Sequence, residues 1–212
     1  ANSQNIMGDT PLMIIPQNKD TRADVYDLLL KSGGNPNAKN NYGDTPLHIA
    51  VMAGMDISIL KSLTDAGADI NERNKEGKTP LTMAVNHMDI EQVRFLTQQK
   101  NADIHAEDNE GTSPLIIALT LSPKDVKEKS EILKLLVTQK NISSRDSYGN
   151  SPLHIAVAQN TSSEQLDYLL SLSPEVNGRN KKGETAIFLA VKNNRRKLGE
   201  SLLANGADVF SA

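Results

Sequence analysis

Apolar residues recur along the chain at spacings of three and four, which is the pattern of short amphipathic helices. One such set is Ile59, Leu60 and Leu63, and the next is Val93 and Leu96. The same spacing returns further on at Ile132, Leu133, Leu135 and Leu136, at Leu166, Leu169 and Leu170, and at Leu198, Leu202 and Leu203. Each apolar face needs a partner, so the pattern predicts helices that pack against one another.

A second kind of segment recurs with a nearly constant sequence. Its copies are GDTPLMII from Gly8, GDTPLHIA from Gly43, GKTPLTMA from Gly77, GTSPLIIA from Gly111, GNSPLHIA from Gly149 and GETAIFLA from Gly183. Successive glycines lie 35, 34, 34, 38 and 34 residues apart. Self-similarity at such a period is typical of stacked repeat architectures. The spacing predicts one domain over 1–212 with six repeats, at about 5–39, 40–73, 74–107, 108–145, 146–179 and 180–212.

Each part of the recurring segment has a structural interpretation. Asn or Asp followed by Gly, as in KNNYG and RNKKG, favours the positive φ angles of a tight hairpin turn. Thr or Ser followed by Pro then supplies a helix N-cap and a first helical residue. The second helices end at segments in which Gly67 and Gly206 suit a left-handed C-cap. Every unit is therefore predicted to be hairpin, helix, turn and antiparallel helix.

This order of elements, with its TPLHIA signature, closely resembles the ankyrin-repeat family over about residues 5 to 210. The resemblance implies an all-α solenoid of helix-turn-helix units with projecting β-hairpin loops and a concave face. In that family the Thr and His of TPLH hold neighbouring loops by hydrogen bonds. Here those residues would be Thr45 with His48, and Ser151 with His154.

Three departures from the repeat change the prediction locally. Pro16 falls where the first helix of repeat one should continue, so that helix is expected to be short or kinked. Repeat six has Ala186 in place of Pro and a polar second helix, RRKLGESLLANG, which indicates a C-terminal cap. Extra residues around LTLSPKDVKEKS, from Leu119, should lengthen the turn between the two helices of repeat four.

Composition agrees with thin layers and narrows the partner class. Hydrophobic residues make up 38% of the chain but aromatic ones only 3%, so small aliphatic side chains must fill the core. The net charge of -3 does not favour nucleic acid, and no apolar run reaches the 18 residues of a membrane span. Without cysteine the chain has no disulfide and no thiolate metal site. The abundance of Ile, Asn and Lys without Trp is typical of a microbial, for example bacterial, source.

Motifs of catalysis are absent from the sequence. We find no phosphate loop, no G-x-G-x-x-G, no H-E-x-x-H and no nucleophile elbow, so we expect no enzyme activity, no cofactor and no metal. His48 and His154 fall in the helix-start motif, which favours structural hydrogen bonding over acid-base work. Asp65, Asp69 and Glu72 lie around a C-cap and hairpin, where Asp is common for its local backbone bonds.

The resemblance places the contact surface on the hairpin tips and the exposed starts of the first helices. Tyr42 and Tyr148 are either interface anchors or residues that pack on the neighbouring hairpin, with equal support for each interpretation. Tyr26 and Tyr168, inside second helices, are expected to be partly buried. The candidate partner-binding residues are Tyr42, Asp44, Met52, Lys75, Glu76, Lys78, Asn86, His87, Glu110, Thr112, Tyr148, Asn150, Lys181 and Lys182.

Positive charge gathers near the end of the chain, where residues 180–212 hold six Lys or Arg against three Asp or Glu. This group could meet an acidic partner or a phosphate, although a solvated face of the last repeat explains it more simply. Its members are Lys181, Lys182, Lys192, Arg195, Arg196 and Lys197. Because no aromatic residues are interleaved with them, a nucleic-acid role has little support.

The sequence thus favours a monomeric module that binds another protein through the concave face. One alternative is the targeting part of a larger enzyme or of a secreted bacterial effector. A small-molecule or sugar site at the irregular turn of repeat four is a further alternative. The compartment stays open between the cytoplasm and export after removal of a signal segment, because the chain opens with ANSQN and not with Met.

Overall fold

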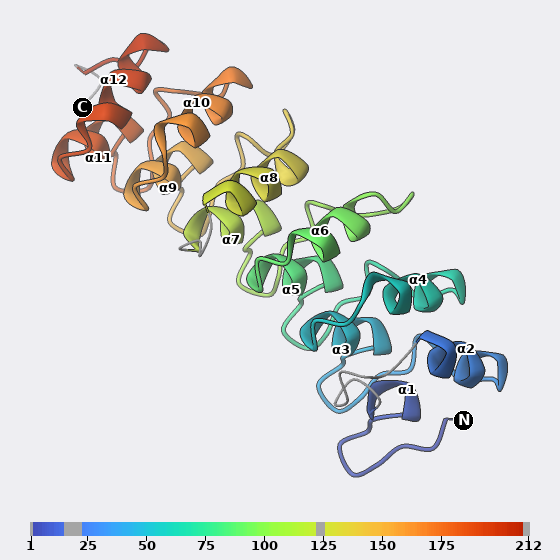
Figure 1. Ribbon diagram of the computed structural model, residues 1–212. Helices are drawn as coiled ribbons and strands as arrows, with labels where there is room; N and C mark the ends of the chain where they lie inside the picture. Colours follow the sequence, from blue (N-terminus) through green and yellow to red (C-terminus); the bar gives the residue numbers. More distant parts are fainter. Residues whose placement is uncertain (1, 15–22, 122–125, 210–212) are drawn as a thin grey trace. The chain divides into compact units, whose positions relative to one another are not determined.

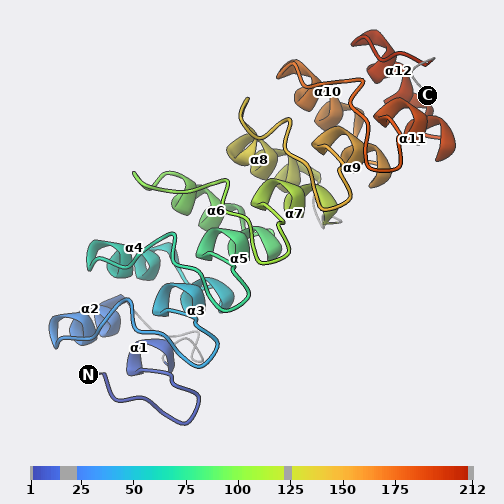
Figure 2. The ribbon, with the colours of Figure 1, turned by 180° about the vertical axis from the view of Figure 1, so that it is seen from behind.

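The computed structural model describes residues 2–14, 23–121 and 126–209, and within these ranges the chain forms twelve helices and no strand (Figures 1 and 2). The nearly all-helical architecture confirms the predicted fold class. In chain order the helices are α1 Pro11–Ile14, α2 Ala23–Lys31, α3 Pro46–Met52, α4 Ile57–Asp65, α5 Pro80–Asn86, α6 Ile90–Thr97, α7 Pro114–Thr120, α8 Val126–Leu136, α9 Pro152–Ala158, α10 Ser163–Ser171, α11 Ala186–Lys192 and α12 Arg196–Ala204.

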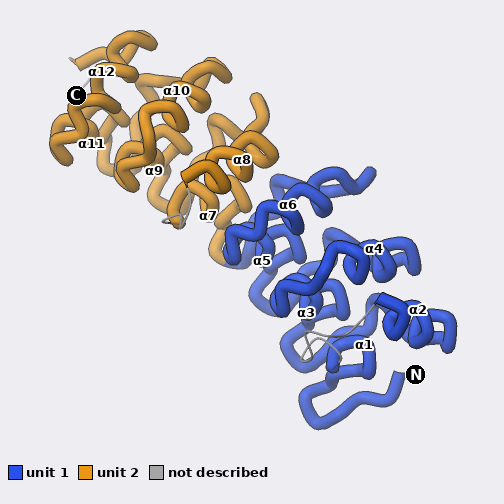
Figure 3. Tube along the Cα trace, viewed as in Figure 1, with its two compact units in different colours: residues 1–109 blue, residues 110–212 orange. Residues whose placement is uncertain are grey.

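Two compact units make up the chain, residues 1–109 and residues 110–212 (Figure 3). In the first unit α1, α3 and α5 pack side by side as one layer, and α2, α4 and α6 form a second layer. In the second unit α9 packs between α7 and α11, while α10 packs against α12. Within each unit the two helices of a pair also contact each other, as α3 does with α4 and α9 with α10. The core is therefore a series of thin layers, as the low aromatic content predicts.

Hydroxyl N-caps begin the first helices where the sequence places them. Thr45 has extended backbone angles, and its side-chain oxygen accepts a hydrogen bond from the His48 N–H. Thr79 does the same for Thr82, and a proline follows each cap as the first helical residue. The glycine before each cap has a positive φ between 74° and 80°, as the hairpin turn requires. In the described chain the predicted β-hairpins are loops without strands. An isolated antiparallel β-bridge joins Arg179 to Thr185.

Asparagines spaced one repeat apart hydrogen-bond to the segment that follows the second helix of the next repeat. The Asn37 side chain donates to the Gly67 carbonyl (2.8 Å) and accepts from the Asp69 N–H (2.7 Å). Asn71 makes the equivalent pair of bonds to the Asn101 carbonyl (2.6 Å) and the Asp103 N–H (2.8 Å). Each such asparagine satisfies two backbone groups that a helix end would otherwise leave unpaired, and so holds the spacing between layers.

The insertion in repeat four is only partly within the described structure, because residues 122–125 lie outside it. Some of the extra length extends α8, which has 11 residues where α10 has 9. The ammonium group of Lys129 on α8 is buried and donates to the carbonyls of Leu119 (3.0 Å) and Leu121 (2.7 Å). Burial lowers the pKa of Lys129. This lysine therefore caps the end of α7, a position at which a cation is favourable.

The ends of the chain show how the other departures are accommodated. Helix α1 ends at Ile14 in the described residues, and Pro16 lies outside them. Helix α12 exposes Arg196, Lys197 and Glu200, in line with a polar capping helix, but Leu203 is also 49% exposed. Helix α11, however, leaves Phe188 44% and Val191 72% exposed, whereas Val157, at the position equivalent to Val191, is fully buried. The last helix pair thus presents apolar as well as polar groups to its surroundings.

The two tyrosines of the second helices differ in burial. Tyr26 is completely buried, and burial raises the pKa of its hydroxyl. Tyr168 is half-buried on α10. Both act as packing residues of the second-helix layer, and Tyr26 is buried more deeply than the sequence indicates.

Candidate partner-binding surface

Backbone bonds fix the hairpin tips that carry the candidate contact residues. In the first unit the Lys75 N–H donates to the Tyr42 carbonyl (3.0 Å). The Lys181 N–H donates in the same way to the Tyr148 carbonyl (3.0 Å) in the second unit. The Asn40 side-chain oxygen also accepts from the N–H groups of Tyr42 and Asp44 (both 2.9 Å). The side chains of the tips consequently project from a rigid frame.

Neighbouring hairpins are joined by side-chain bonds at equivalent positions. The Asn74 amide donates to Asp44 (2.9 Å), and the Asn180 amide donates to Asn150 (2.9 Å). Asp44 is only 6% exposed as a result. The structure thus gives Asp44 a place in the frame, whereas the sequence offers it as a contact residue.

A cleft of about 490 Å³ lies in the first unit between the hairpin tips and the C-terminal ends of α3 and α5, where Met52 and Asn86 are the last helical residues. All of the candidate contact residues of this unit line it, together with Asn74 and Met83: Tyr42, Asp44, Met52, Lys75, Glu76, Lys78, Asn86 and His87. Tyr42 and Met52 are 56% and 50% exposed. The Lys78 ammonium pairs with the Glu76 carboxylate (2.6 Å). This cleft therefore combines an exposed apolar side with internally paired charges.

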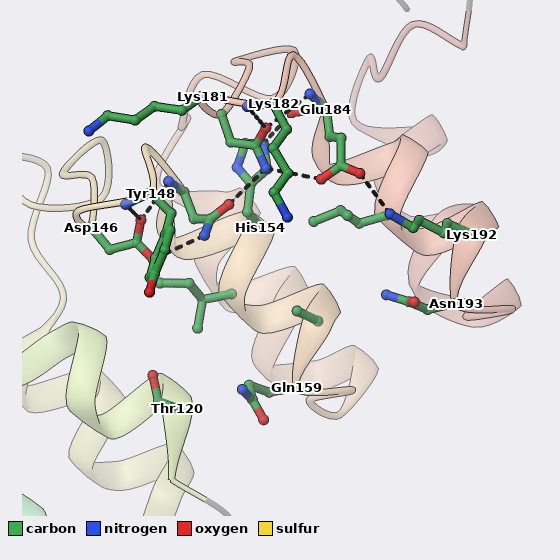
Figure 4. A pocket seen from close by; sticks show the side chains of 15 residues that line it. Thr120, Asp146, Tyr148, His154, Gln159, Lys181, Lys182, Glu184, Lys192 and Asn193 are labelled. Atoms are coloured by element: carbon green, nitrogen blue, oxygen red, sulfur yellow. Dashed lines mark hydrogen bonds and ion pairs between the residues drawn. The ribbon is translucent and has the colours of Figure 1, made fainter.

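A second cleft of about 510 Å³ lies at the equivalent place in the second unit (Figure 4). It brings together four of the candidates, Tyr148, Asn150, Lys181 and Lys182, whereas Glu110 and Thr112 do not line it. Tyr148 is 70% exposed. Other lining residues, which the candidate set leaves out, are Thr120, Asp146, His154, Ile155, Ala158, Gln159, Asn180, Glu184, Leu189, Lys192 and Asn193. Most of these residues lie 106 residues after a residue that lines the first cleft, so the period of the sequence could have predicted them.

Two residues that line the second cleft, Lys192 and Glu184, form an ion pair. The Lys192 ammonium donates to Glu184 (2.8 Å), and the Asn180 amide lies 3.3 Å from the other carboxylate oxygen. These hydrogen bonds, that of Lys192 first, lower the pKa of Glu184. Figure 4 shows both partners on the same side of the cleft, opposite Tyr148. Glu184 is thus held in its charged form by groups of its own unit.

Two histidines each join a first helix to the following hairpin, His48 from α3 and His154 from α9. The Thr45 N–H donates to His48 Nδ1 (3.2 Å), and His48 Nε2 lies 3.0 Å from the Lys78 carbonyl. Ser151, His154 and Glu184 repeat this arrangement, with 2.9 Å between His154 Nε2 and the Glu184 carbonyl. Since Nδ1 accepts, the proton is on Nε2, which donates. The structural role that the sequence assigns to both histidines is confirmed.

Protonation of these histidines should weaken the fold. Burial lowers the pKa of His48 and of His154, and the backbone bonds to Lys78 and Glu184 oppose it only in part. Between the lowered pKa and about 6.5 the unfolded chain binds protons that the folded chain does not. The free energy of unfolding is therefore expected to fall as the pH drops below about 6.5.

Urea unfolding at about pH 7.5 and about pH 5 tests this expectation in the wild type and in a His48→Gln, His154→Gln variant. The double variant should lose less stability on acidification than the wild type. A His87→Gln variant is the control, because His87 is exposed and lies outside this arrangement. Equal losses in the wild type and the double variant would show that other groups carry the acid sensitivity.

Comparison with known proteins agrees with this geometry. The family model for ankyrin repeats, in three copies, matches residues 1–74, 52–128 and 124–212. The chain belongs to the ankyrin-repeat family. No curated protein sequence matches it. Ankyrin repeats are protein-interaction modules, and no helix within the described ranges is long and apolar enough to cross a membrane.

Two solved ankyrin-like structures extend the comparison. The ankyrin repeat domain of Bcl-3, described as a unique member of the IkappaB protein family, is 28% identical with a TM-score of 0.77. That match covers 95% of this chain and 88% of the Bcl-3 chain. A chain from the complex of the Bd0816 predatory endopeptidase of Bdellovibrio bacteriovorus with the immunity protein Bd3460 is 24% identical with a TM-score of 0.74. This second match covers 95% of the present chain and 99% of the other, and shows the ankyrin fold alone.

Within the described residues no group of three or more His, Cys, Asp or Glu side chains gathers as a metal site would require. His48 and His154 hold neighbouring backbone groups. The site is therefore described by two clefts with charged side chains in their lining and an exposed tyrosine in each unit.

Proposed function

We propose that this ankyrin-repeat chain holds a partner protein through the face formed by its hairpin tips and the exposed residues of its first helices. This is the face that lies on the concave side in ankyrin stacks. The observation that carries the proposal is the recurrence of one arrangement in both units. In each, an exposed tyrosine stands at a backbone-fixed tip beside a cleft of about 500 Å³.

Exposed tyrosines in such places suit an anchoring role. Tyr42 and Tyr148 expose 56% and 70% of their surface, which supports an anchoring role over packing on the neighbouring hairpin. Tyrosine offers a large contact area at low cost in conformational entropy, and removing a true anchor costs about 2 kcal/mol or more of binding free energy. Because the tip backbone is already ordered, little further entropy is lost when a partner binds.

A capture experiment tests the proposed face. Immobilised wild-type chain and a Tyr42→Ala, Met52→Ala, His87→Ala, Tyr148→Ala variant are incubated with lysate from the native source, and bound proteins are identified by mass spectrometry. The affinity of the variant for the main partner is expected to fall by about thirtyfold or more, because losing even one anchor of about 2 kcal/mol weakens binding by that factor. Circular dichroism confirms that the variant is folded.

The matched control changes four exposed residues of the second helices, Lys61→Ala, Glu91→Ala, Lys134→Ala and Asp167→Ala. It should recover the same partner as the wild type. If the tip variant and the wild type bind the same proteins in the same amounts, the contact surface lies elsewhere.

A further inference from the structure

The clefts of the two units are built from equivalent positions that differ by 106 residues, as Tyr148 does from Tyr42 and Lys181 from Lys75. Their backbone frames share the same bonds, with 3.0 Å from each lysine N–H to the tyrosine carbonyl. Differences in what they bind must therefore come from the side chains at the other equivalent positions. The two clefts form a matched pair within one chain.

Charge is the main difference between them. The first cleft has two lysines, Lys75 and Lys78, and two carboxylates, Asp44 and Glu76, so its formal charge is zero. In the second, Lys182 takes the place of Glu76, and Lys192 takes the place of Asn86.

The second cleft holds three lysines, Lys181, Lys182 and Lys192, against Asp146 and Glu184, which leaves a formal charge of +1. At two further equivalent positions the second cleft has a smaller side chain, with Ala158 in place of Met52 and Asn193 in place of His87. The second cleft is thus more cationic and more polar than the first.

The carboxylates of the second cleft are already engaged. Asp146 accepts from the N–H groups of Tyr148 (2.9 Å) and Asn150 (2.8 Å) and so holds the hairpin tip. Glu184 is paired with Lys192 (2.8 Å). Both carboxylates therefore already have hydrogen-bond partners, and Lys182 acts on Glu184 only through its charge, without an ion pair.

One ammonium group remains for a ligand. The Lys181 ammonium donates to the Ser147 carbonyl (2.7 Å). Among the described residues no acceptor contacts the Lys182 ammonium. Figure 4 shows that the Lys182 side chain extends into the space between Tyr148 on one side and Lys192 on the other. The amide side chains of Gln159 and Asn193 border the same space and can donate hydrogen bonds to an anion.

We propose that the second cleft binds the carboxylate of a Glu or Asp side chain in an extended acidic peptide segment of the partner. The Lys182 ammonium pairs with that carboxylate, and the Tyr148 ring packs against its aliphatic stem. The inference rests on the proposed function and adds the chemistry of the partner at this site. The first cleft, with balanced charges and Met52 and Met83 in its lining, does not share the preference.

Nuclear magnetic resonance tests the preference in the full chain. An unlabelled hexaglutamate peptide is titrated into the ¹⁵N-labelled protein, beside a hexaglutamine peptide of the same length. Hexaglutamate is expected to shift the amide signals of Tyr148, Lys182 and Asn193 but not those of Tyr42 and Glu76. Raising NaCl from about 50 mM to about 500 mM should reduce these shifts, because exposed charge pairs are screened by salt.

Two charge exchanges at equivalent positions sharpen the test. Lys182→Glu gives the second cleft the residue of the first and should weaken hexaglutamate binding about tenfold or more. Glu76→Lys gives the first cleft the residue of the second, and its signals should then respond to hexaglutamate. Both positions are exposed, so unchanged thermal unfolding is expected and separates a charge effect from loss of fold.

Several outcomes would overturn the acidic-peptide proposal. Equal shifts with hexaglutamine would show that binding does not depend on the negative charge of the peptide. Equal shifts with inorganic phosphate would show that the cleft binds anions without preferring peptide carboxylates. If hexaglutamate shifts no signal while the tip variant still loses its partner, the proposed function stands and the acidic preference is wrong. If the tip variant also keeps its partner, both proposals fail.

Discussion

A Gly43→Ala substitution is expected to lower the free energy of unfolding by about 3 kcal/mol. Gly43 has a φ of 78°, which alanine adopts only with strain. A Cβ atom there would also lie 2.9 Å from the Lys75 backbone nitrogen and 3.3 Å from Asn74 Cα. The backbone cannot withdraw without loosening the bond from Lys75 to Tyr42 that fixes the first cleft. Urea unfolding followed by far-ultraviolet circular dichroism measures the loss.

Gly183 provides the control for this experiment at an equivalent position. Its φ is 77°, but no atom of the described residues lies within 4 Å of the place where a Cβ would stand. Gly183→Ala should therefore cost only the backbone strain, about 1 kcal/mol. If both substitutions cost the same, the close approach of the neighbouring hairpin contributes nothing.

Leu166→Ala in the second unit is the other substitution with a large expected effect. Leu166 is fully buried on α10, where that helix packs against α9 and α12. Removing a buried leucine side chain loses its burial free energy and leaves a cavity, which together cost about 3 kcal/mol. The same urea experiment should show a lower midpoint with an unchanged slope.

Asp167→Ala is the matched control for Leu166→Ala, because the neighbouring side chain is exposed on the same helix. Both changes place alanine in α10 and so alter helix propensity in the same direction. Asp167→Ala is expected to stay within about 0.5 kcal/mol of the wild type. A similarly small effect for Leu166→Ala would mean that neighbouring side chains move into the cavity and fill it.

The parts of the fold that follow a local rule could be predicted from the sequence. Thr45 and Pro46 start a helix because a hydroxyl cap and a missing N–H are favourable there in any context. The positive φ of Gly43 follows from the turn, and the role of His48 follows from its place in the motif. The family comparison confirms the repeat family, whereas the number of six repeats stays a prediction.

The candidate site could be predicted as far as it repeats. The candidate residues Tyr42 and Lys75 lie together in the lining of the first cleft, because a constant period carries the hairpin tips of the unit to the same face. The inward turn of Asp44 could not be predicted, since it depends on the Asn74 amide that arrives from the next hairpin. Whether these residues contact a partner stays a prediction.

Lys129 shows the limit of pattern reasoning most clearly. In the sequence it belongs to a charged insertion and gives no sign of burial. In the structure its stem runs inward and its ammonium meets two carbonyls, those of Leu119 and Leu121, at the end of α7. An irregular segment has no second copy in the chain to compare with, so only its packing reveals such a role.

Because main-chain bonds hold the hairpin tips in place, the frame of the fold makes little demand on the side chains of Tyr42, Lys75, Tyr148 and Lys182. Substitutions at these positions can accumulate in evolution, or be introduced as a randomised library, while the scaffold keeps its shape. The molecule therefore separates the residues that maintain its architecture from those that choose its partner, and the second group is free to diverge.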